Sequence, residues 1–305
     1  MDYALEVKDL VKRYGRRTVL DRFSLAVPEF SSVGLVGPNG AGKTTFMMTV
    51  VGFVQPTSGD INLLGNGPFS AEVHSGRISI LPQDSELPLE GKPQELLEQY
   101  GILQGLSARD ARLSAAELLK AVNLSDRADS QIRTLSHGMR KRVMVAQCFV
   151  GFPELVLLDE PLSGLDPLEV SRMRAFIQSR RGRQTIVISS HNLHDIEILC
   201  THVVMIDRGR VTRFEEMERL TEVGDRLVYK LTAVPGDLEV LKDAVPGLTL
   251  KWYPNDNSLV CVFSDSGMAP EKINAALLPI LLKQTGVLSI SQGSSLEAAY
   301  LKEPV

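Results

Sequence analysis

The chain has 305 residues, of which 44% are hydrophobic and 23% charged, enough for one core of ordinary size and a small second domain. Its formal charge of −4 argues against non-specific nucleic-acid binding, because such binding depends on a basic excess that neutralises phosphates. No run approaches the roughly 20 apolar residues that a membrane helix needs, so a partner must hold the protein at any membrane where it works.

The cysteine pattern argues against a metal site. Cys148, Cys200 and Cys261 stand far apart and form no C-x-x-C pair. They fit reduced thiols that pack as small apolar residues in a cytosolic protein.

The first two-thirds of the chain alternate apolar, β-like runs with amphipathic segments, which is the pattern of an α/β domain. Several runs are continuously apolar, as expected for strands buried on both faces of a sheet. The expected strands cover residues 4–10, 32–37, 77–83, 155–159, 185–190 and 203–207. The last of these continues into VVMIDRGRVTRF, which predicts a hairpin that turns at Arg208 and Gly209.

A helical insertion interrupts this alternation. Residues 93–124 contain two helical stretches, and Ser107 and Asp110 at the start of the second resemble a capping box. We therefore expect a helical subdomain between strands of the sheet.

A different composition begins near residues 215–226. Beyond it the sequence predicts the order β-α-β-β-α-β, which is that of a ferredoxin-like unit. The expected elements cover residues 227–233, 237–244, 248–253, 258–264, 270–284 and 287–292, with a turn at PNDN (254–257). No residue cluster in this region looks catalytic.

GPNGAGKTT (37–45) matches G-x-x-x-x-G-K-[ST] and lies between a buried strand and a helix-like stretch. Its glycines let backbone N–H groups turn inward toward an anion, and the helix N-terminus adds positive potential. Lys43 is placed to reach the β- and γ-phosphates, the Thr44 hydroxyl to bind Mg²⁺, and Thr45 to approach the α-phosphate. The nucleotide-binding residues expected here are Gly37, Pro38, Asn39, Gly40, Ala41, Gly42, Lys43, Thr44 and Thr45.

LVLLDEP (155–161) supplies two acidic residues. The apolar strand brings Asp159 to the carboxyl edge of the sheet, where it can support Mg²⁺. Glu160 points elsewhere and could activate a water for attack on the γ-phosphate.

Residues 135–142, LSHGMRKR, contain a helix start but no acid and no nucleophile beside a base. LSHG resembles the signature sequence, usually LSGGQ, of ABC-type ATP-binding subunits. Other segments of the chain resemble the remaining motifs of that family and stand in the family's order. Before LSHG come Tyr14, which resembles the aromatic that stacks on adenine, the phosphate loop and the Q-loop Gln83. After it come the Asp159–Glu160 pair, the D-loop SGLD (163–166) and the switch residue His191.

This resemblance implies a P-loop NTPase fold in which two nucleotide-binding domains pair head to tail. ATP and Mg²⁺ would be bound by one subunit, with Thr44, Gln83 and Asp159 at the metal, and Ser136, Gly138 and Asp166 of the other subunit would close over the nucleotide. Glu160, His191 and Gln83 would be the catalytic residues.

The signature segment departs from the family pattern at His137 and Met139. The flanking Ser136 and Gly138, which would contact phosphate, are kept. His137 could reach the nucleotide or face solvent. The octet also fits an ordinary N-capped helix with a core stripe formed by Met139, Val143, Ala146 and Val150, and both descriptions can hold together.

The resemblance also implies a domain division. Residues 1–220 would form the ABC-type ATP-binding domain, with its helical subdomain at about 84–150, and residues 221–305 a C-terminal accessory α+β domain. That accessory domain could instead be a ligand sensor or dimerisation module.

The function implied is an ATPase subunit of an ABC transporter on the inner face of the cell membrane, a homodimer that works with separate transmembrane subunits and binds no nucleic acid. Residues 82–107 and the end SLEAAYL (295–301) resemble exporter-type, drug- or lipid-linked members, which favours export. The alternative is a soluble ABC-type ATPase acting on DNA or the ribosome. Repair members would need a long coiled-coil insertion before Ser136, and translation members carry two ATP sites in one chain.

Overall fold

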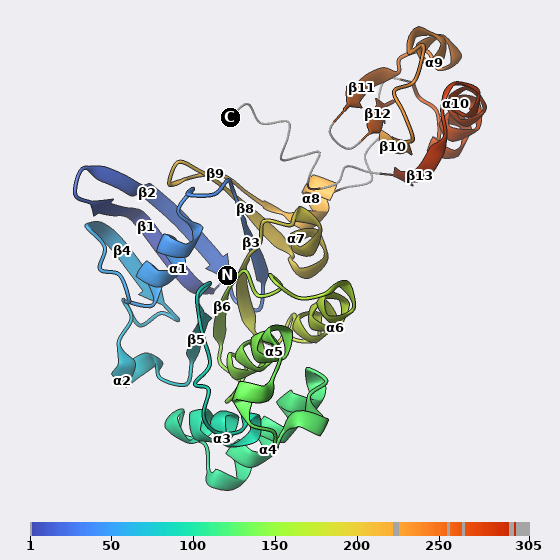
Figure 1. The fold of residues 1–305 in the computed structure, drawn as a ribbon. Coiled ribbons are helices and arrows are strands. Elements are labelled where there is room, and N and C mark those ends of the chain that lie inside the picture. The colour runs from blue at the N-terminus through green and yellow to red at the C-terminus, as the bar shows by residue number, and fades with distance from the viewer. Residues whose placement is uncertain (1, 222–225, 255–256, 264–265, 293–295, 297–305) are drawn as a thin grey trace. The chain divides into compact units, whose positions relative to one another are not determined.

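The structure is a computed structural model that describes residues 2–221, 226–254, 257–263, 266–292 and 296. They divide into two compact units, Met1–Glu216 and Met217–Val305, each of which has its own hydrophobic core (Figure 1). The units are described separately below.

A six-stranded sheet forms the centre of the first unit. Its order is β5 (Ile78–Leu81), β6 (Leu155–Asp159), β7 (Thr185–Ser189), β3 (Ser32–Val36), β8 (His202–Asp207) and β9 (Arg210–Glu216). All neighbours are parallel except β8 and β9. Every residue of β3, β6 and β7 is buried, which confirms the prediction drawn from their continuous apolar runs. The loops that follow the parallel strands therefore meet at one edge of the sheet.

The hairpin between β8 and β9 is confirmed. Arg208 and Gly209 have φ of 45° and 77°, so both central residues are left-handed, as in a type I′ turn. A Cβ on Gly209 would lie 2.1 Å from the carbonyl oxygen of Val19, so only glycine fits at this position.

A second, antiparallel sheet has the order β2 (Arg17–Pro28), β1 (Tyr3–Tyr14) and β4 (Ser58–Leu63). The sequence predicts only residues 4–10 of this sheet. Asp21, Arg22 and Ser24 interrupt the apolar residues of β2, and β4 opens with Ser58-Gly59-Asp60, so neither strand shows a long apolar run. The tight β1–β2 connection pairs Tyr14 with Arg17.

Helix α1 (Lys43–Val50) packs between the two sheets (Figure 1). Phe46, Met47 and Val50 are fully buried, and the rings of Phe46 and Phe23 stack with centroids 4.5 Å apart. Burial on both sides fixes the N-terminus of α1 at the carboxyl edge of the parallel sheet.

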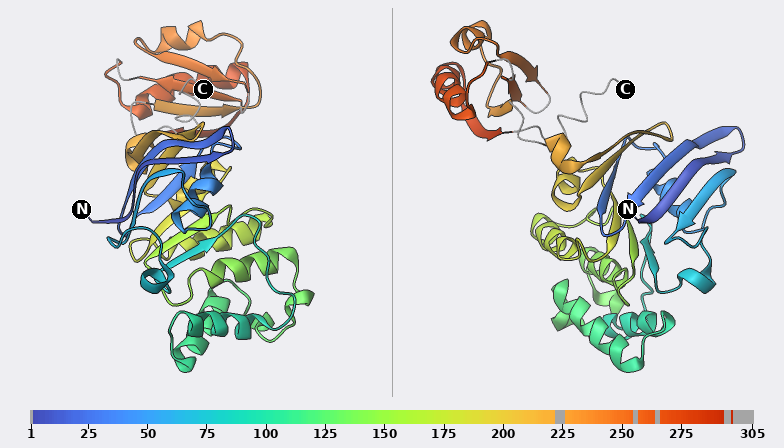
Figure 2. Two further views of the ribbon diagram at one scale, coloured as in Figure 1. Left: turned by 90° about the vertical axis from the view of Figure 1, so that its left-hand side faces the viewer. Right: turned by 180° about the vertical axis from the view of Figure 1, so that it is seen from behind.

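Helices gather on the other side of the first unit, away from the antiparallel sheet, as Figure 1 and the right-hand view of Figure 2 show. They are α3 (Pro93–Leu103), α4 (Ala108–Ala121), α5 (His137–Gln147), α6 (Pro167–Gln178) and α7 (Leu193–Leu199), with a short α2 (Ala71–His74) and the 3₁₀ turns Ser125–Arg127 and Ile132–Thr134 elsewhere in the unit. Ser107 caps α4 as predicted, because its Oγ accepts from the Asp110 N–H at 3.1 Å.

An ion pair ties α5 to α6. Arg142 on α5 lies 3.0 Å from Glu169 on α6, and the two side chains are only 7% and 14% exposed. Arg142 also donates to the carbonyl of Val122 at 2.9 Å, so the start of α6 and the end of α4 are held against the same helix.

The second unit has the predicted ferredoxin-like order. It contains α8 (Met217–Thr221), β10 (Arg226–Leu231), α9 (Glu239–Ala244), β11 (Thr249–Tyr253), β12 (Ser258–Val262), α10 (Pro270–Gln284) and β13 (Val287–Gln292). The antiparallel sheet has the order β11-β12-β10-β13. Trp252 is partly buried and packs against the core of this unit. The middle of the PNDN turn and SLEAAYL, apart from Leu296, lie outside the described residues.

None of the helices in the described part of the chain combines the length and the apolar composition that a bilayer span requires. Cys148, Cys200 and Cys261 are free thiols buried in apolar surroundings, as expected. Burial raises the pKa of the Cys148 thiol to about 12, so this side chain behaves as a small apolar residue.

Candidate functional site

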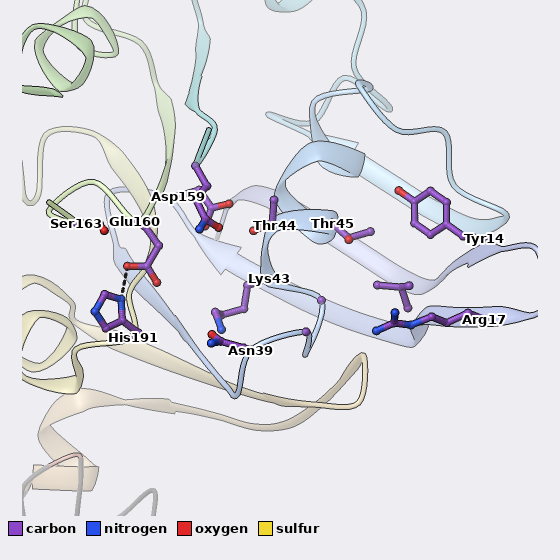
Figure 3. Close-up of a pocket in the computed structure, with 14 residues that line it drawn as sticks. Tyr14, Arg17, Asn39, Lys43, Thr44, Thr45, Asp159, Glu160, Ser163 and His191 are labelled. Atoms are coloured by element: carbon purple, nitrogen blue, oxygen red, sulfur yellow. Dashed lines mark hydrogen bonds and ion pairs between the residues drawn. The ribbon is translucent and has the colours of Figure 1, made fainter. Parts of the chain in front are cut away.

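A cavity of about 750 Å³ opens at the carboxyl edge of the parallel sheet (Figure 3). It brings together strand ends and loops that are far apart in the sequence. The residues that line it are Tyr14, Arg17, Val19, Asn39, Gly40, Gly42, Lys43, Thr44, Thr45, Gln83, Asp159, Glu160, Ser163 and His191. Most of the residues singled out in the sequence therefore share one site, and the remaining loop residues Gly37, Pro38 and Ala41 are neighbours of the lining residues along the chain.

The loop of residues 37–45 needs its glycines. Gly42 has φ of 107° and caps α1 without a side-chain hydrogen bond, which leaves the first N–H groups of the helix available to an anion. A Cβ on Gly37 would lie 2.2 Å from the carbonyl oxygen of Ile206, so the loop can approach β8 only because this residue lacks a side chain. The result is a backbone cradle with the positive end of a helix at its base.

Lys43 is held at the centre of this cradle. Its Nζ donates to the carbonyl oxygens of Gly37 at 2.6 Å and Pro38 at 3.2 Å. Burial lowers the pKa of the ammonium group, and the nearby carboxylates of Glu160 and Asp159 oppose that shift. The side chain thus places a positive charge where the loop surrounds the cavity.

Asp159 lies at the end of β6 and is 2% exposed. The Ser189 hydroxyl on β7 donates to Oδ1 of this carboxylate, whereas Oδ2 is buried and has no hydrogen-bond partner in the described structure. A buried carboxylate oxygen without a partner is energetically unfavourable unless a cation or a donor satisfies it.

The oxygen atoms at this position fit Mg²⁺. The Thr44 hydroxyl, the Gln83 side-chain amide oxygen and the unpaired Oδ2 of Asp159 line the same cavity, and oxygen is the ligand type that Mg²⁺ prefers. Within the described residues no group of three or more His, Cys, Asp and Glu side chains forms an alternative metal centre.

Glu160 adopts a left-handed backbone conformation with φ of 50°, which turns its side chain away from that of Asp159. Its N–H donates to the hydroxyl oxygen of Ser189 at 3.1 Å. His191 Nδ1 donates to Glu160 Oε2 at 2.8 Å, as the dashed line in Figure 3 marks. The glutamate is 12% and the histidine 69% exposed, so the carboxylate is held by a group that faces solvent.

The signature segment (residues 135–142) starts helix α5. Ser136 is the N-cap, and its Oγ accepts from the Met139 N–H at 3.2 Å. Val143, Ala146 and Val150 are buried, as the core-stripe description predicts, while Met139 is only half-buried. Ser136 and His137, where the helix begins, are exposed.

His137 packs against the SGLD loop of its own chain. A Cβ on Gly164, whose φ is 78°, would lie 3.1 Å from His137 Nε2, and one on Gly138 would lie 3.5 Å from Leu165. The signature segment and the SGLD loop therefore form one contiguous surface.

Ser136, Gly138 and Asp166 do not line the cavity formed by the described residues of their own chain. Asp166 caps α6, with Oδ1 accepting from the Glu169 N–H at 3.0 Å. Ser163, three residues earlier, does line the cavity, so the SGLD loop runs from the site to the surface that carries Ser136.

Three site residues, Arg17, Val19 and Ser189, are absent from the sequence-based prediction. Arg17 and Val19 enter the cavity because β2 follows β1 through a tight turn, and Ser163 enters as the first residue of the SGLD loop named from the sequence. Ser189 contacts both acidic residues from the neighbouring strand. Ser189 ends an apolar run that the sequence predicts as a strand, but its contact with Asp159 and Glu160 depends on the pairing of β6 with β7, which only the structure shows.

Comparison with known proteins adds independent information. Residues 20–163 match the ABC transporter family. The chain is 32% identical to a Nod factor export ATP-binding protein I of Cupriavidus metallidurans over 99% of its own length and 97% of the relative, and 33% identical to a protein of the same name from Ralstonia nicotianae, covering 86% and 82%. A solved structure described as the ATP-binding subunit of an ABC transporter superposes with a TM-score of 0.65 at 29% identity, covering 71% of this chain and 91% of that one.

Proposed function

The chain belongs to the ABC transporter family as an ATP-binding and ATP-hydrolysing subunit, and from that premise we propose that two copies bind ATP head to tail and energise export. In this family such subunits dimerise and work with transmembrane components. We propose in addition that the second subunit is another copy of this chain and that transport is outward.

One observation carries the proposal. The cavity contains Tyr14, the phosphate loop, Gln83, both acidic residues and His191, whereas Ser136, Gly138 and Asp166 do not line it. We take these three residues as the second half of a nucleotide site that the cavity of a partner chain completes. Head-to-tail pairing of two identical chains would form two complete nucleotide sites, because every contact across a two-fold interface occurs twice.

Within one subunit, Tyr14 stacks on the adenine, and the N–H groups of residues 37–45 bind the phosphates together with Lys43. Thr44, Gln83 and Asp159 would hold Mg²⁺, which would supply positive charge to offset the charge of the phosphates. Glu160 orients and deprotonates the attacking water, and the His191 hydrogen bond keeps its carboxylate on the γ-phosphate side of the cavity.

The second subunit contributes the Ser136 hydroxyl, the Gly138 N–H and the start of α5, with Asp166 beside them. Because the γ-phosphate contacts both subunits, ATP binds the closed dimer more tightly than the open one and shifts the equilibrium toward closure. Hydrolysis removes that bridge. The alternation between open and closed dimers is what membrane subunits would use.

Two features support export with a membrane partner. The full-length relatives are named for export, which supports export here as well. A second cavity of about 480 Å³ lies between the segment after Gln83 and helix α5, and Leu87, Leu89 and Met144 give it an apolar wall. This groove is where we place contact with the membrane subunits, which would hold the chain at the inner face of the membrane. Residues 217–305 would be an accessory domain.

The test is the Glu160→Gln variant of the full chain in Mg-ATP. Loss of a general base predicts hydrolysis slower by at least about a hundredfold, with ATP affinity retained and a dimer that persists on sedimentation. The wild-type chain is the control, because it hydrolyses the ATP that holds the two subunits together. A variant that hydrolyses ATP at the wild-type rate would remove Glu160 as the base.

A further inference from the structure

Arg17 is a cation in the cavity to which the roles above give no task. It is the first residue of β2 and pairs with Tyr14 across the tight connection from β1. In Figure 3 its side chain extends from the strand toward the phosphate loop, on the side of the loop where Tyr14 lies.

The Arg17 guanidinium group lies close to the phosphate loop, and its N–H donors are unpaired among the described residues. Its Nη2 lies 3.9 Å from the position that a Cβ on Gly40 would occupy. Among the described residues, Arg17 makes no side-chain hydrogen bond or ion pair, whereas Arg210, on the neighbouring β9, is paired with Asp21 at 2.6 Å. The Arg17 donors therefore remain available to a ligand.

The acidic residues of the cavity do not neutralise this charge. Asp159 and Glu160 lie on the opposite side of Lys43 from Arg17 (Figure 3), and each already has a hydrogen-bond partner in Ser189 or His191. An anion between Tyr14 and the loop would face Lys43 from one side and Arg17 from the other. A planar guanidinium is well suited to a phosphate oxygen pair.

We infer that Arg17 is a nucleotide-binding residue that contacts a phosphate group of ATP on the Tyr14 side of the loop. The inference rests on the proposed function. It adds a second cation, supplied by the β1–β2 hairpin, to the phosphate loop and its lysine.

Arg16 provides a matched control. It is the adjacent residue, carries the same charge and is exposed, but it does not line the cavity. Equilibrium binding of Mg-ATP to the full chain would be measured for Arg17→Ala, Arg16→Ala and wild type at low and high ionic strength. We expect Arg17→Ala to weaken binding about tenfold or more at low salt and Arg16→Ala less than about threefold, since only a direct charge-assisted contact has the larger effect. The loss should shrink at high salt, because exposed charge pairs are screened.

Three results would overturn the inference. Equal losses in the two variants would indicate a general effect of net charge, unchanged affinity of Arg17→Ala would indicate no contact, and a loss independent of salt would indicate stacking on the base. Lys43→Ala separates this inference from the proposed function. If Lys43→Ala loses ATP and Arg17→Ala keeps it, only the role of Arg17 fails; if Lys43→Ala binds ATP normally, the nucleotide site itself is wrong.

Discussion

Ser189, fully buried at the end of β7, donates its hydroxyl proton to Asp159 and accepts from the backbone N–H of Glu160. One side chain thus positions the two acidic residues to which we give different tasks. The left-handed backbone at Glu160 separates the carboxylates further, so one faces the loop and the other faces His191.

Replacing Ser189 with Ala should destabilise the chain and impair hydrolysis together. Removal of the hydroxyl leaves the buried Oδ1 of Asp159 without its donor, and an unsatisfied buried polar group costs about 1–3 kcal/mol. Denaturant unfolding of the first unit and steady-state hydrolysis would measure the two effects. Wild-type stability in the variant would show that Ser189 does not hold Asp159.

The identities of individual site residues were predictable where a motif carries its own spacing. Gly42, Lys43 and Thr44 follow from the phosphate-loop pattern, and Asp159 follows from its place at the end of an apolar strand. Arg17 and Ser189 belong to no such pattern. They reach the cavity through strand pairing, which residue spacing along the chain does not reveal.

Helix α5 carries the surface that we assign to the partner's nucleotide. Ser136 and His137 at its start are exposed, while Val143 and Ala146 pack into the core and Arg142 pairs with Glu169 on α6. The inner face therefore fixes the helix independently of the residues at its N-terminus.

Gly138→Asp should separate folding from dimer closure. A carboxylate in the first turn of a helix is stabilising or neutral, and a Cβ at Gly138 would make only an ordinary contact, at 3.5 Å, with Leu165. The same negative charge would repel a phosphate approaching that turn.

In a Glu160→Gln background, Gly138→Asp should weaken the ATP-dependent dimer at least about tenfold more than the neutral Gly138→Asn, because like charges that meet across an interface are strongly unfavourable. Circular dichroism and thermal unfolding are the folding controls. Equal dimerisation of the two variants would mean that no phosphate approaches this turn.

A strand could be predicted from the sequence where all of its residues are buried, because its side chains then form a largely apolar run. Residues 32–37, 155–159 and 185–190 are continuous apolar runs and become central strands. β2 and β4 lie in a sheet with only partial burial, where polar and charged residues interrupt the apolar ones irregularly, so their periodicity is weak. Helix α10 has an interior Pro279, yet its apolar positions recur at helical spacing and it forms as predicted.

In the chain as a whole, the two compact units have separate cores. All of the residues that line the nucleotide cavity belong to the first unit. Truncation after residue 221 should therefore leave a folded chain with basal ATP hydrolysis near that of the full chain. Loss of solubility or of cooperative unfolding would show that the first unit depends on the second.

The head-to-tail arrangement requires that a complete site draw its two halves from different chains. Lys43→Ala removes the half that holds the phosphates, and Gly138→Asp removes the half that closes over them. Each variant alone has no complete site. A mixed dimer has one, built from the intact loop of the Gly138→Asp chain and the intact signature turn of the Lys43→Ala chain.

Hydrolysis by an equimolar mixture of the two variants, assayed with the membrane subunits, is thus the decisive measurement, with the Lys43→Ala, Gly138→Asp double variant as control. We expect activity to reappear in the mixture and to be absent from each variant and from the control. A mixture as inactive as its components would contradict a nucleotide site shared between two chains.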